Sequence, residues 1–127
     1  DLNKALELNP DSAEAYNYRG GAYLNLQQYK NAIADFNKAL ELNPDNAEAY
    51  LGRSGYYYQM GKRENAIADM EKAIQLFCQQ GSSDACQKAQ EVLRLMQTES
   101  QGKLTEILHF FAITAGEGIP RLIDKVH

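Results

Sequence analysis

The sequence predicts an all-α protein, a solenoid of antiparallel helix pairs closed by a C-terminal capping helix, and three observations support this prediction. First, the stretch DLNKALELNPDSAEAY at 1–16 returns as DFNKALELNPDNAEAY at 35–50, with only two letters changed. A fixed period of 34 residues is typical of stacked helix-turn-helix units. Second, apolar residues within each unit recur at helical spacing. Third, Asn-Pro-Asp segments separate the helical stretches.

Length and charge narrow the function classes. A chain of 127 residues corresponds to about one domain, and its net charge of −4 comes from interspersed acids and bases. Without a basic stripe, nucleic acid is excluded as the expected partner. The longest apolar stretch, at 108–115, is far shorter than the roughly 18 residues that span a bilayer, so we expect a soluble chain.

The first helix of each unit is expected at about 13–26 and 47–60. Each begins after Asn-Pro-Asp, where proline disfavours a helical residue before it and where Ser12 or Asn46 can cap the new helix. The pair Gly20 and Gly21 lies in the middle of the first of these helices. Because glycine costs about 1 kcal/mol there relative to alanine, we expect another helix to approach closely.

The second helix of each unit is expected at about 29–42 and 63–80. Its apolar residues fall at steps of one, three, three and one, which defines one face of an α-helix. In the first unit these residues are Ala32, Ile33, Phe36, Ala39 and Leu40, and in the second they are Ala66, Ile67, Met70, Ala73 and Ile74.

The repeats therefore divide residues 1–96 into a partial repeat at 1–12 and full repeats at 13–46 and 47–80, followed by a capping helix within 81–99. Gly81 is placed as a helix stop. The partial repeat is a second helix without its first, which suggests a piece of a longer array and leaves the apolar face of Leu2, Ala5, Leu6 and Leu8 open to stacking on another copy.

The segment 100–127 breaks the period and contains an apolar stripe within a helix expected at about 103–115. Large apolar side chains gain about 1.5 to 3 kcal/mol each on burial, so something must cover the stripe. Three coverings are considered. We favour the end of the array or another copy of the chain, then the concave groove of the array, and last a membrane surface, for which the positive charge is too small. The stripe consists of Leu104, Ile107, Leu108, Phe111 and Ala115.

The residue types at fixed positions of each unit resemble the pattern of the tetratricopeptide repeat over residues 1 to about 96. The residues that carry the resemblance are Tyr16, Gly20, Tyr23, Ala32, Phe36, Ala39 and Pro44, with Tyr50, Tyr57, Ala66, Met70 and Ala73 in the next unit. The resemblance implies a right-handed superhelix whose first helices form a concave, peptide-binding wall. The chain departs from the family pattern at Arg19 and Arg53, where leucine is usual, at Ser54, where glycine is usual, and at 77–78, where Asn-Pro is usual.

The resemblance also implies a set of groove residues that would contact a partner. They are Glu14, Asn17, Gly21, Leu24 and Asn25 in the first unit, and Glu48, Leu51, Gly55, Tyr58 and Gln59 in the second. Family members that grip a C-terminal carboxylate use lysine, arginine and asparagine here. In this chain Asn17 stands where such members have a lysine, and Gly21 and Gly52 stand where they have asparagines. A carboxylate clamp is therefore not supported. The two glutamates weakly favour a neutral or basic partner segment.

The two unusual arginines are interpreted as structural. Arg19 precedes Asp35 by sixteen residues, and Arg53 precedes Asp69 by the same interval, so each arginine can meet the second helix of its own unit. Asp1 and Asp35 of the preceding helices are alternative partners. Paired charges are tolerated at a half-buried interface where a lone charge is not.

No catalytic or metal-binding pattern is found. Cys78 and Cys86 are eight residues apart, which fits no metal-ligand spacing; a disulfide between them is conceivable, but two free thiols are favoured. The two histidines, His109 and His127, lie outside the repeats. We therefore expect no enzyme, no metal and no cofactor, but a soluble scaffold for a protein or peptide partner, with self-assembly into a homo-oligomer as the alternative. The compartment stays open, with the cytoplasm favoured.

Overall fold

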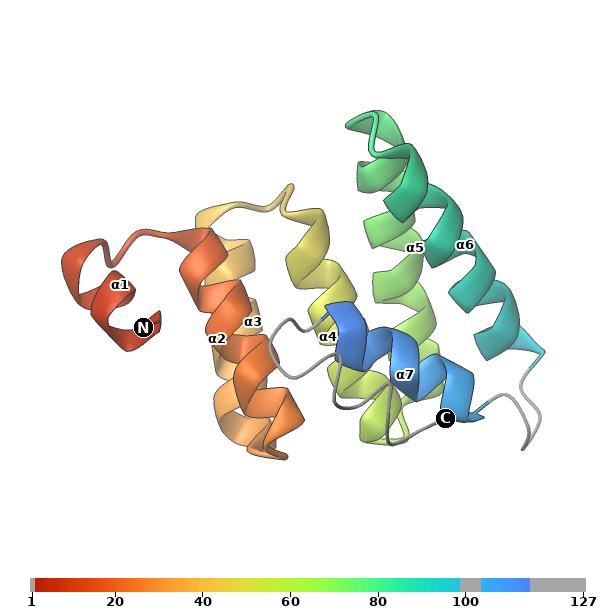
Figure 1. Cartoon of the computed structure of the whole chain (residues 1–127), viewed down its shortest axis with the longest axis horizontal. Helices are drawn as coiled ribbons and strands as arrows, with labels where there is room; N and C mark the ends of the chain where they lie inside the picture. Colours follow the sequence, from red (N-terminus) through yellow and green to blue (C-terminus); the bar gives the residue numbers. More distant parts are fainter. Residues whose placement is uncertain (1, 99–103, 115–127) are drawn as a thin grey trace.

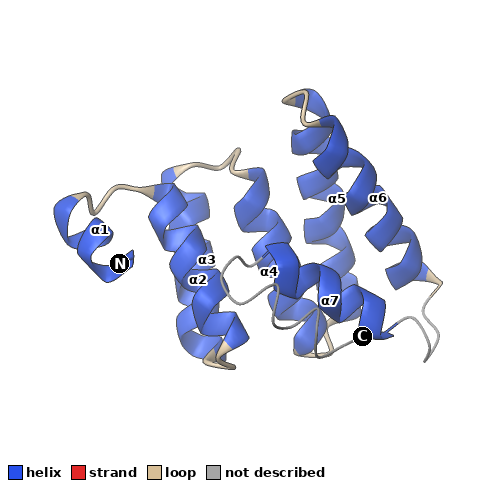
Figure 2. Ribbon diagram, in the orientation of Figure 1, coloured by secondary structure: helices blue, strands red, loops and turns tan. Residues whose placement is uncertain are grey.

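The computed structural model describes residues 2–98 and 104–114, and this part of the chain folds into α-helices without strands (Figure 2). Residue 1 and the tail from 115 onward, including His127 and the end of the predicted stripe, lie outside the described residues. The helices are α1 (Leu2–Leu8), α2 (Ala13–Asn25), α3 (Tyr29–Leu42), α4 (Ala47–Gln59), α5 (Arg63–Gln79), α6 (Ser83–Gln97) and α7 (Leu104–Thr114).

From α1 to α6, each helix packs on its neighbours in chain order, so the pairs follow one another along the long axis of the molecule (Figure 1). In addition, α2 packs on α4, so the first helices of the two full units also touch. This arrangement confirms the predicted all-α solenoid. The observed boundaries lie within about two residues of the expected ones, which is the usual disagreement at helix ends.

The repeated Asn-Pro-Asp segment forms the same turn twice. Asn9 and Asn43 each accept a hydrogen bond through Oδ1 from the backbone N–H two residues on, at 3.3 Å and 3.1 Å. Such Asx turns direct the chain out of one helix. Ser12 Oγ and Asn46 Oδ1 then cap the next helix by accepting from the N–H groups of Ala15 and Ala49, each at 3.1 Å.

Three helix ends turn through a left-handed residue. Gly61 and Gly81 follow α4 and α5 with φ of 76° and 79°, and Gln27 adopts the same conformation after α2 with φ of 62°. Glycine takes this conformation without steric cost, so Gly81 ends α5 as the sequence predicted. Gln27 and Gly61 are equivalent positions of the two units, which shows that the turn geometry is kept although the residue type differs.

The core lies between the helix pairs and extends to α6 and α7. The larger cluster of buried residues joins α4, α5, α6 and α7, while a smaller one consists of Leu24, Ala32 and Phe36. On α6, Ala89, Val92, Leu95 and Met96 are buried. At the other end, Leu6 of α1 is buried but Leu8 is 76% exposed, so α1 presents an apolar side chain to solvent.

Candidate functional site

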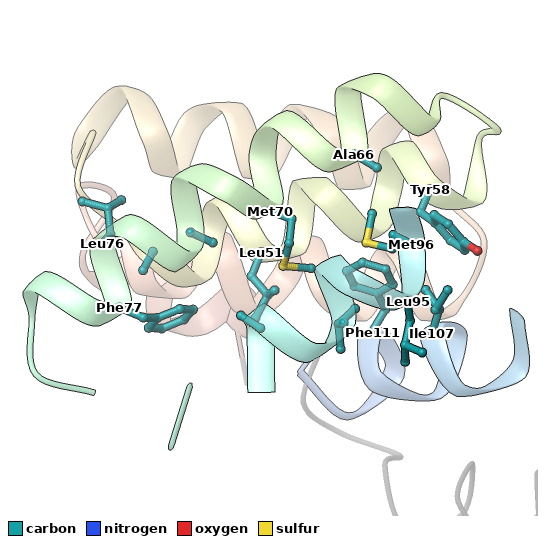
Figure 3. Packing of buried hydrophobic residues seen from close by; sticks show 14 residues of the cluster. Leu51, Tyr58, Ala66, Met70, Leu76, Phe77, Leu95, Met96, Ile107 and Phe111 are labelled. Atoms are coloured by element: carbon teal, nitrogen blue, oxygen red, sulfur yellow. The ribbon is translucent and has the colours of Figure 1, made fainter. Parts of the chain in front are cut away.

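The helix α7 packs against α4 and α6, so the non-repeat helix lies on the first helix of the second unit. Among the side chains of α7 that the structure describes, Ile107 is buried at 0% and Phe111 at 2% exposure. Figure 3 shows both pointing toward the side chains of Tyr58, Leu95 and Met96. We call the surface formed by Leu51, Gly55 and Tyr58 of α4 the α4 face. Gly55 and Tyr58 meet Phe111 of α7, and Leu51 lies about one turn before Gly55 on the same helix.

Phe111 of α7 contacts the α4 face at Gly55 and Tyr58. A Cβ atom built on Gly55 would stand 2.9 Å from Cδ1 of Phe111, a distance that real Cβ atoms essentially never show. The ring of Phe111 also lies 5.9 Å from the ring of Tyr58, between centroids, with the planes tilted by 38°. Only a residue without a side chain at position 55 allows an aromatic ring to come this close to the backbone.

This position of α7 departs from the favoured expectation for the tail, which placed the helix at the end of the array or on another copy. Although α7 touches the capping helix α6, it reaches back to α4, at positions that the sequence analysis assigned to the groove. The predicted stripe is also rotated in the structure, because Leu108 is 37% exposed while Phe110, outside the stripe, is half-buried. The spacing of apolar residues along α7 could not show that Phe111 would pack against Gly55 of α4.

The ten predicted groove residues do not form one open surface. Six are buried, one is half-buried and three are exposed. The buried ones are Asn17, Gly21, Leu24, Leu51, Gly55 and Tyr58; Asn25 is half-buried; Glu14, Glu48 and Gln59 are exposed. Leu24 packs in the core cluster with Ala32 and Phe36. Its predicted role as a partner contact is therefore corrected, because its side chain is buried inside the fold.

The exposed glutamates line a small polar cavity of about 130 Å³ where the two units meet. Asn43, Asp45 and Asn46 of the turn complete its wall together with Gln80, whose Nε2 donates to the carbonyl oxygen of Asp45 at 3.1 Å. This hydrogen bond ties the end of α5 to the turn before α4. The cavity is therefore acidic and belongs to the joint between units.

A larger, mostly apolar cleft of about 510 Å³ lies beside α7, and we call it the α7 cleft. Its apolar walls are Leu51, Phe77, Ala85 and Phe110, which come from α4, α5, α6 and α7. Asp84, Lys88, Glu106 and His109 supply its polar rim. The cleft exists only because α7 is seated on the array, since three of these eight residues lie on α7.

Each unusual arginine forms a two-pronged ion pair within its own unit. Arg19 donates through Nε to Asp35 Oδ2 at 2.7 Å and through Nη2 to Oδ1 at 2.8 Å; Arg53 and Asp69 repeat this geometry at 2.7 Å and 2.9 Å. The remaining Nη1 donates to an asparagine of the preceding helix, Asn3 or Asn37. The preceding helix thus contributes an amide, whereas Asp1 and Asp35 had been considered as alternatives.

Aromatic rings complete the surroundings of both guanidinium groups. Arg53 lies 5.6 Å and 5.9 Å from the ring centroids of Tyr50 and Tyr57, and Arg19 has the equivalent tyrosines at 5.6 Å and 5.7 Å. The hydrogen bonds that the guanidinium groups donate to Asp35 and Asp69 raise the pKa of both arginines above the ordinary value, although partial burial acts in the opposite direction. The guanidinium groups are thus engaged inside the fold, which favours a structural role over a ligand role.

Cys78 and Cys86 are joined by a disulfide that links the last turn of α5 to the first turns of α6, where the sequence had favoured two free thiols. The helix turn at Gly81 brings the two Cα atoms to 5.1 Å, within the range that a disulfide requires. Sequence spacing alone could not show this, because the distance depends on how sharply the chain turns between the helices.

Among residues 2–98 and 104–114, no group of three or more His, Cys, Asp or Glu side chains is arranged to hold a metal ion. In the same ranges, no helix combines the length and apolar character needed to cross a membrane.

Stacked antiparallel helix pairs with nearest-neighbour contacts define the chain as a helical-repeat protein of the α-solenoid class. Two tetratricopeptide repeat family models match it, one over residues 13–46 and the other over residues 47–77. Together the two matches cover about half of the chain, and the chain belongs to the tetratricopeptide repeat family. Comparison with curated proteins gives no match. Tetratricopeptide repeats generally mediate protein–protein interactions and typically serve as non-catalytic scaffolds.

Proposed function

We propose that this chain is a protein-interaction scaffold that binds a helical segment of a partner protein on the α4 face. The observation that carries this proposal is the seating of α7, whose Ile107 and Phe111 are buried on the array by contact with a first helix. Since α7 is outside the repeats, its packing serves as an example of how the array accepts an amphipathic helix. Helix-in-groove recognition of this kind uses apolar residues three or four positions apart.

The composition of the α4 face suits this role. Gly55 gives an aromatic side chain access to the backbone, and Tyr58 offers a ring for it to pack on. Aromatic anchors in such pockets contribute a large share of the binding energy at interfaces. The exposed side chains of Glu14 and Glu48 add negative charge at the joint between units, which favours a neutral or basic partner.

The proposal can be tested on the full chain carrying Phe111→Ala, which weakens the hold of α7 on the α4 face. A synthetic peptide with the sequence of residues 103–115 is titrated into this variant, and heat or fluorescence anisotropy reports binding. We expect saturable binding, because the peptide supplies the phenylalanine that the chain now lacks. Circular dichroism of the variant shows whether the repeats stay helical.

Two altered peptides provide matched controls. A peptide with Phe111→Ala should bind at least about tenfold more weakly, because a buried aromatic contact is worth more than the 1.4 kcal/mol that corresponds to tenfold. A peptide with Leu108→Ala should bind nearly as well as the original, since Leu108 is among the exposed residues of α7. Absence of binding by the original peptide, or equal binding of all three peptides, would show that the α4 face does not recognise helices.

Self-assembly is the second candidate, favoured by the exposure of Leu8 on α1. Apolar repeat edges can stack end to end when nothing covers them. Light scattering over a concentration series should then show a rise in mass that Leu8→Ser abolishes. A monomer at every concentration would remove this candidate.

A further inference from the structure

The α7 cleft shows that α7 covers its seat on the array incompletely. A cleft of about 510 Å³ is large enough for several side-chain groups, and its walls of Leu51, Phe77, Ala85 and Phe110 are apolar. Apolar walls in contact with water gain free energy when an apolar group covers them. The α7 cleft is therefore an unfilled extension of the surface that α7 occupies.

Five described positions of α7 face the array or the cleft; His109 stands at the polar rim of the cleft, and the other four form the seat of the helix. Ile107 and Phe111 are buried, while Phe110 is half-buried at the wall of the cleft. The fourth position lies one turn before Phe110 on the same side of the helix and is occupied by Glu106, which is exposed and lines the cleft. A helix with apolar side chains at positions i, i+1, i+4 and i+5 would fit this site, and α7 supplies three of the four.

We propose that the partner of the α4 face is an amphipathic helix with large apolar side chains at all four of these positions, and that it displaces α7, which acts as an intramolecular competitor. This inference rests on the proposed function and specifies its partner. The partner's first apolar side chain fills the α7 cleft, where α7 presents Glu106. The incomplete fit of α7 makes it displaceable.

Because α7 is covalently joined to the array, a partner helix must compete with the high local concentration of α7 at its seat. Residues 99–103 join α6 to α7, and a short connection of this kind gives a local concentration on the order of millimolar. A free helix with only the contacts of α7 therefore competes poorly. Each additional buried methylene group improves affinity about fourfold, so a leucine in the cleft compensates for much of the tethering.

The experiment uses the isotopically labelled full chain and three unlabelled peptides of residues 103–115: the original sequence, Glu106→Leu and Glu106→Gln. Hydrogen exchange of the labelled chain, read by mass spectrometry over residues 104–114, reports the displacement of α7. We expect the Glu106→Leu peptide to release α7 at a concentration at least about tenfold lower than the original peptide does. Glu106→Gln removes the charge without filling the cleft and should release α7 only at a concentration at least about tenfold higher than Glu106→Leu does.

A chain variant that fills the cleft from the opposite wall provides the matched control. Ala85→Leu on α6 should reduce the advantage of the Glu106→Leu peptide, because part of the space is then taken. Ala68→Leu adds the same side chain at an exposed position of α5 and should leave the advantage unchanged. Circular dichroism of both variants verifies that the repeats remain helical.

The outcomes separate this inference from the proposed function. If the original and Glu106→Leu peptides release α7 at the same concentration, the four-position pattern is wrong while helix binding still holds. If no peptide binds either the wild-type chain or the Phe111→Ala variant, the proposed function fails as well. If Glu106→Leu placed in the chain itself produces a dimer by light scattering, the occupant is a second copy, and the assignment to a different partner is overturned.

Discussion

Phe36 of the first unit lies directly against Gly52 of the second unit: a Cβ atom built on Gly52 would stand 2.4 Å from Cε1 of the Phe36 ring. The same ring faces Gly20 of its own unit, where a built Cβ would stand 2.9 Å away. Phe36 is fully buried. Two glycines on consecutive first helices thus enclose one aromatic ring, and this contact sets how closely the two units stack.

Gly52→Ala should therefore destabilise the protein by about 1 to 3 kcal/mol, the usual cost of overpacking a core. The sign is informative, because alanine is favoured over glycine by about 1 kcal/mol in a helix without such a contact. Urea unfolding followed by circular dichroism measures the change. Combining Gly52→Ala with Phe36→Leu should recover part of the loss, and an unchanged or increased stability of Gly52→Ala alone would contradict the steric account.

The second unit solves the same packing problem differently. Ser54 occupies the position equivalent to Gly20, and Met70 the position equivalent to Phe36; both are fully buried. Ser54 Oγ donates a hydrogen bond to the carbonyl oxygen of Ala66 at 2.6 Å. A flexible methionine leaves room for the serine side chain that a rigid phenylalanine ring excludes.

Placing only the serine of the second unit into the first unit should destabilise the protein, whereas placing both the serine and the methionine there should be tolerated. Gly20→Ser alone should cost about 1 to 3 kcal/mol because its Cβ meets the Phe36 ring. Gly20→Ser together with Phe36→Met reproduces the second unit and should recover most of that loss. Thermal or urea unfolding of the two single variants and the double variant gives the coupling energy; additive effects would show that the two positions do not compensate each other.

Breaking the Arg53–Asp69 pair should destabilise the second unit. Asp69→Asn leaves a half-buried guanidinium group without its carboxylate. We expect the free energy of unfolding to fall by about 2 to 3 kcal/mol. This is at or below the usual cost of breaking a fully buried ion pair, because Arg53 retains some contact with solvent. Glu41→Gln breaks the exposed Lys38–Glu41 pair and serves as a control, with an expected change below about 0.5 kcal/mol. Equal effects of the two substitutions would refute a structural role for the buried pair.

The pH dependence of this contribution follows from the raised pKa of Arg53, which is caused mainly by its hydrogen bonds to Asp69. A group whose pKa is higher in the folded state stabilises the protein below its unfolded pKa and loses this effect only as pH rises through the folded value. For arginine that window lies beyond the mildly alkaline range. The stability difference between the wild type and Asp69→Asn should therefore not shrink when the pH rises from neutral to mildly alkaline values.

The sequence predicted the helix pairs well because their periodicity is local information. The Asn-Pro-Asp turns and the apolar stripes depend on residues a few positions apart, and the period of 34 repeats the same local pattern along the chain. The groove residues were less predictable, since Leu24 proved to be part of the core. The exposure of a side chain on a first helix depends on which neighbour covers it, and the repeat pattern does not contain that information.

The position of α7 and the state of the cysteines were the least predictable features. Both depend on contacts between elements that the repeat does not describe: the Phe111 ring on Gly55, and the approach of the two cysteines across the turn at Gly81. A glycine at a predicted groove position was a usable signal for a close aromatic contact. Nothing in the spacing of the two cysteines distinguished a disulfide from two thiols.

The disulfide between Cys78 and Cys86 should stabilise the joint between α5 and α6. It closes a short loop, with a sequence separation of 8, for which chain entropy predicts a contribution of about 2 to 3 kcal/mol. Adding a dithiol reductant should therefore lower the midpoint of thermal unfolding. The variant with both Cys78→Ser and Cys86→Ser should unfold at the lower midpoint with or without reductant. Such bonds persist in oxidising compartments, so the disulfide does not favour the expected cytoplasmic location, which stays a prediction. A wild-type midpoint that does not respond to the reductant, while free-thiol labelling confirms reduction, would show that the bond contributes nothing to stability.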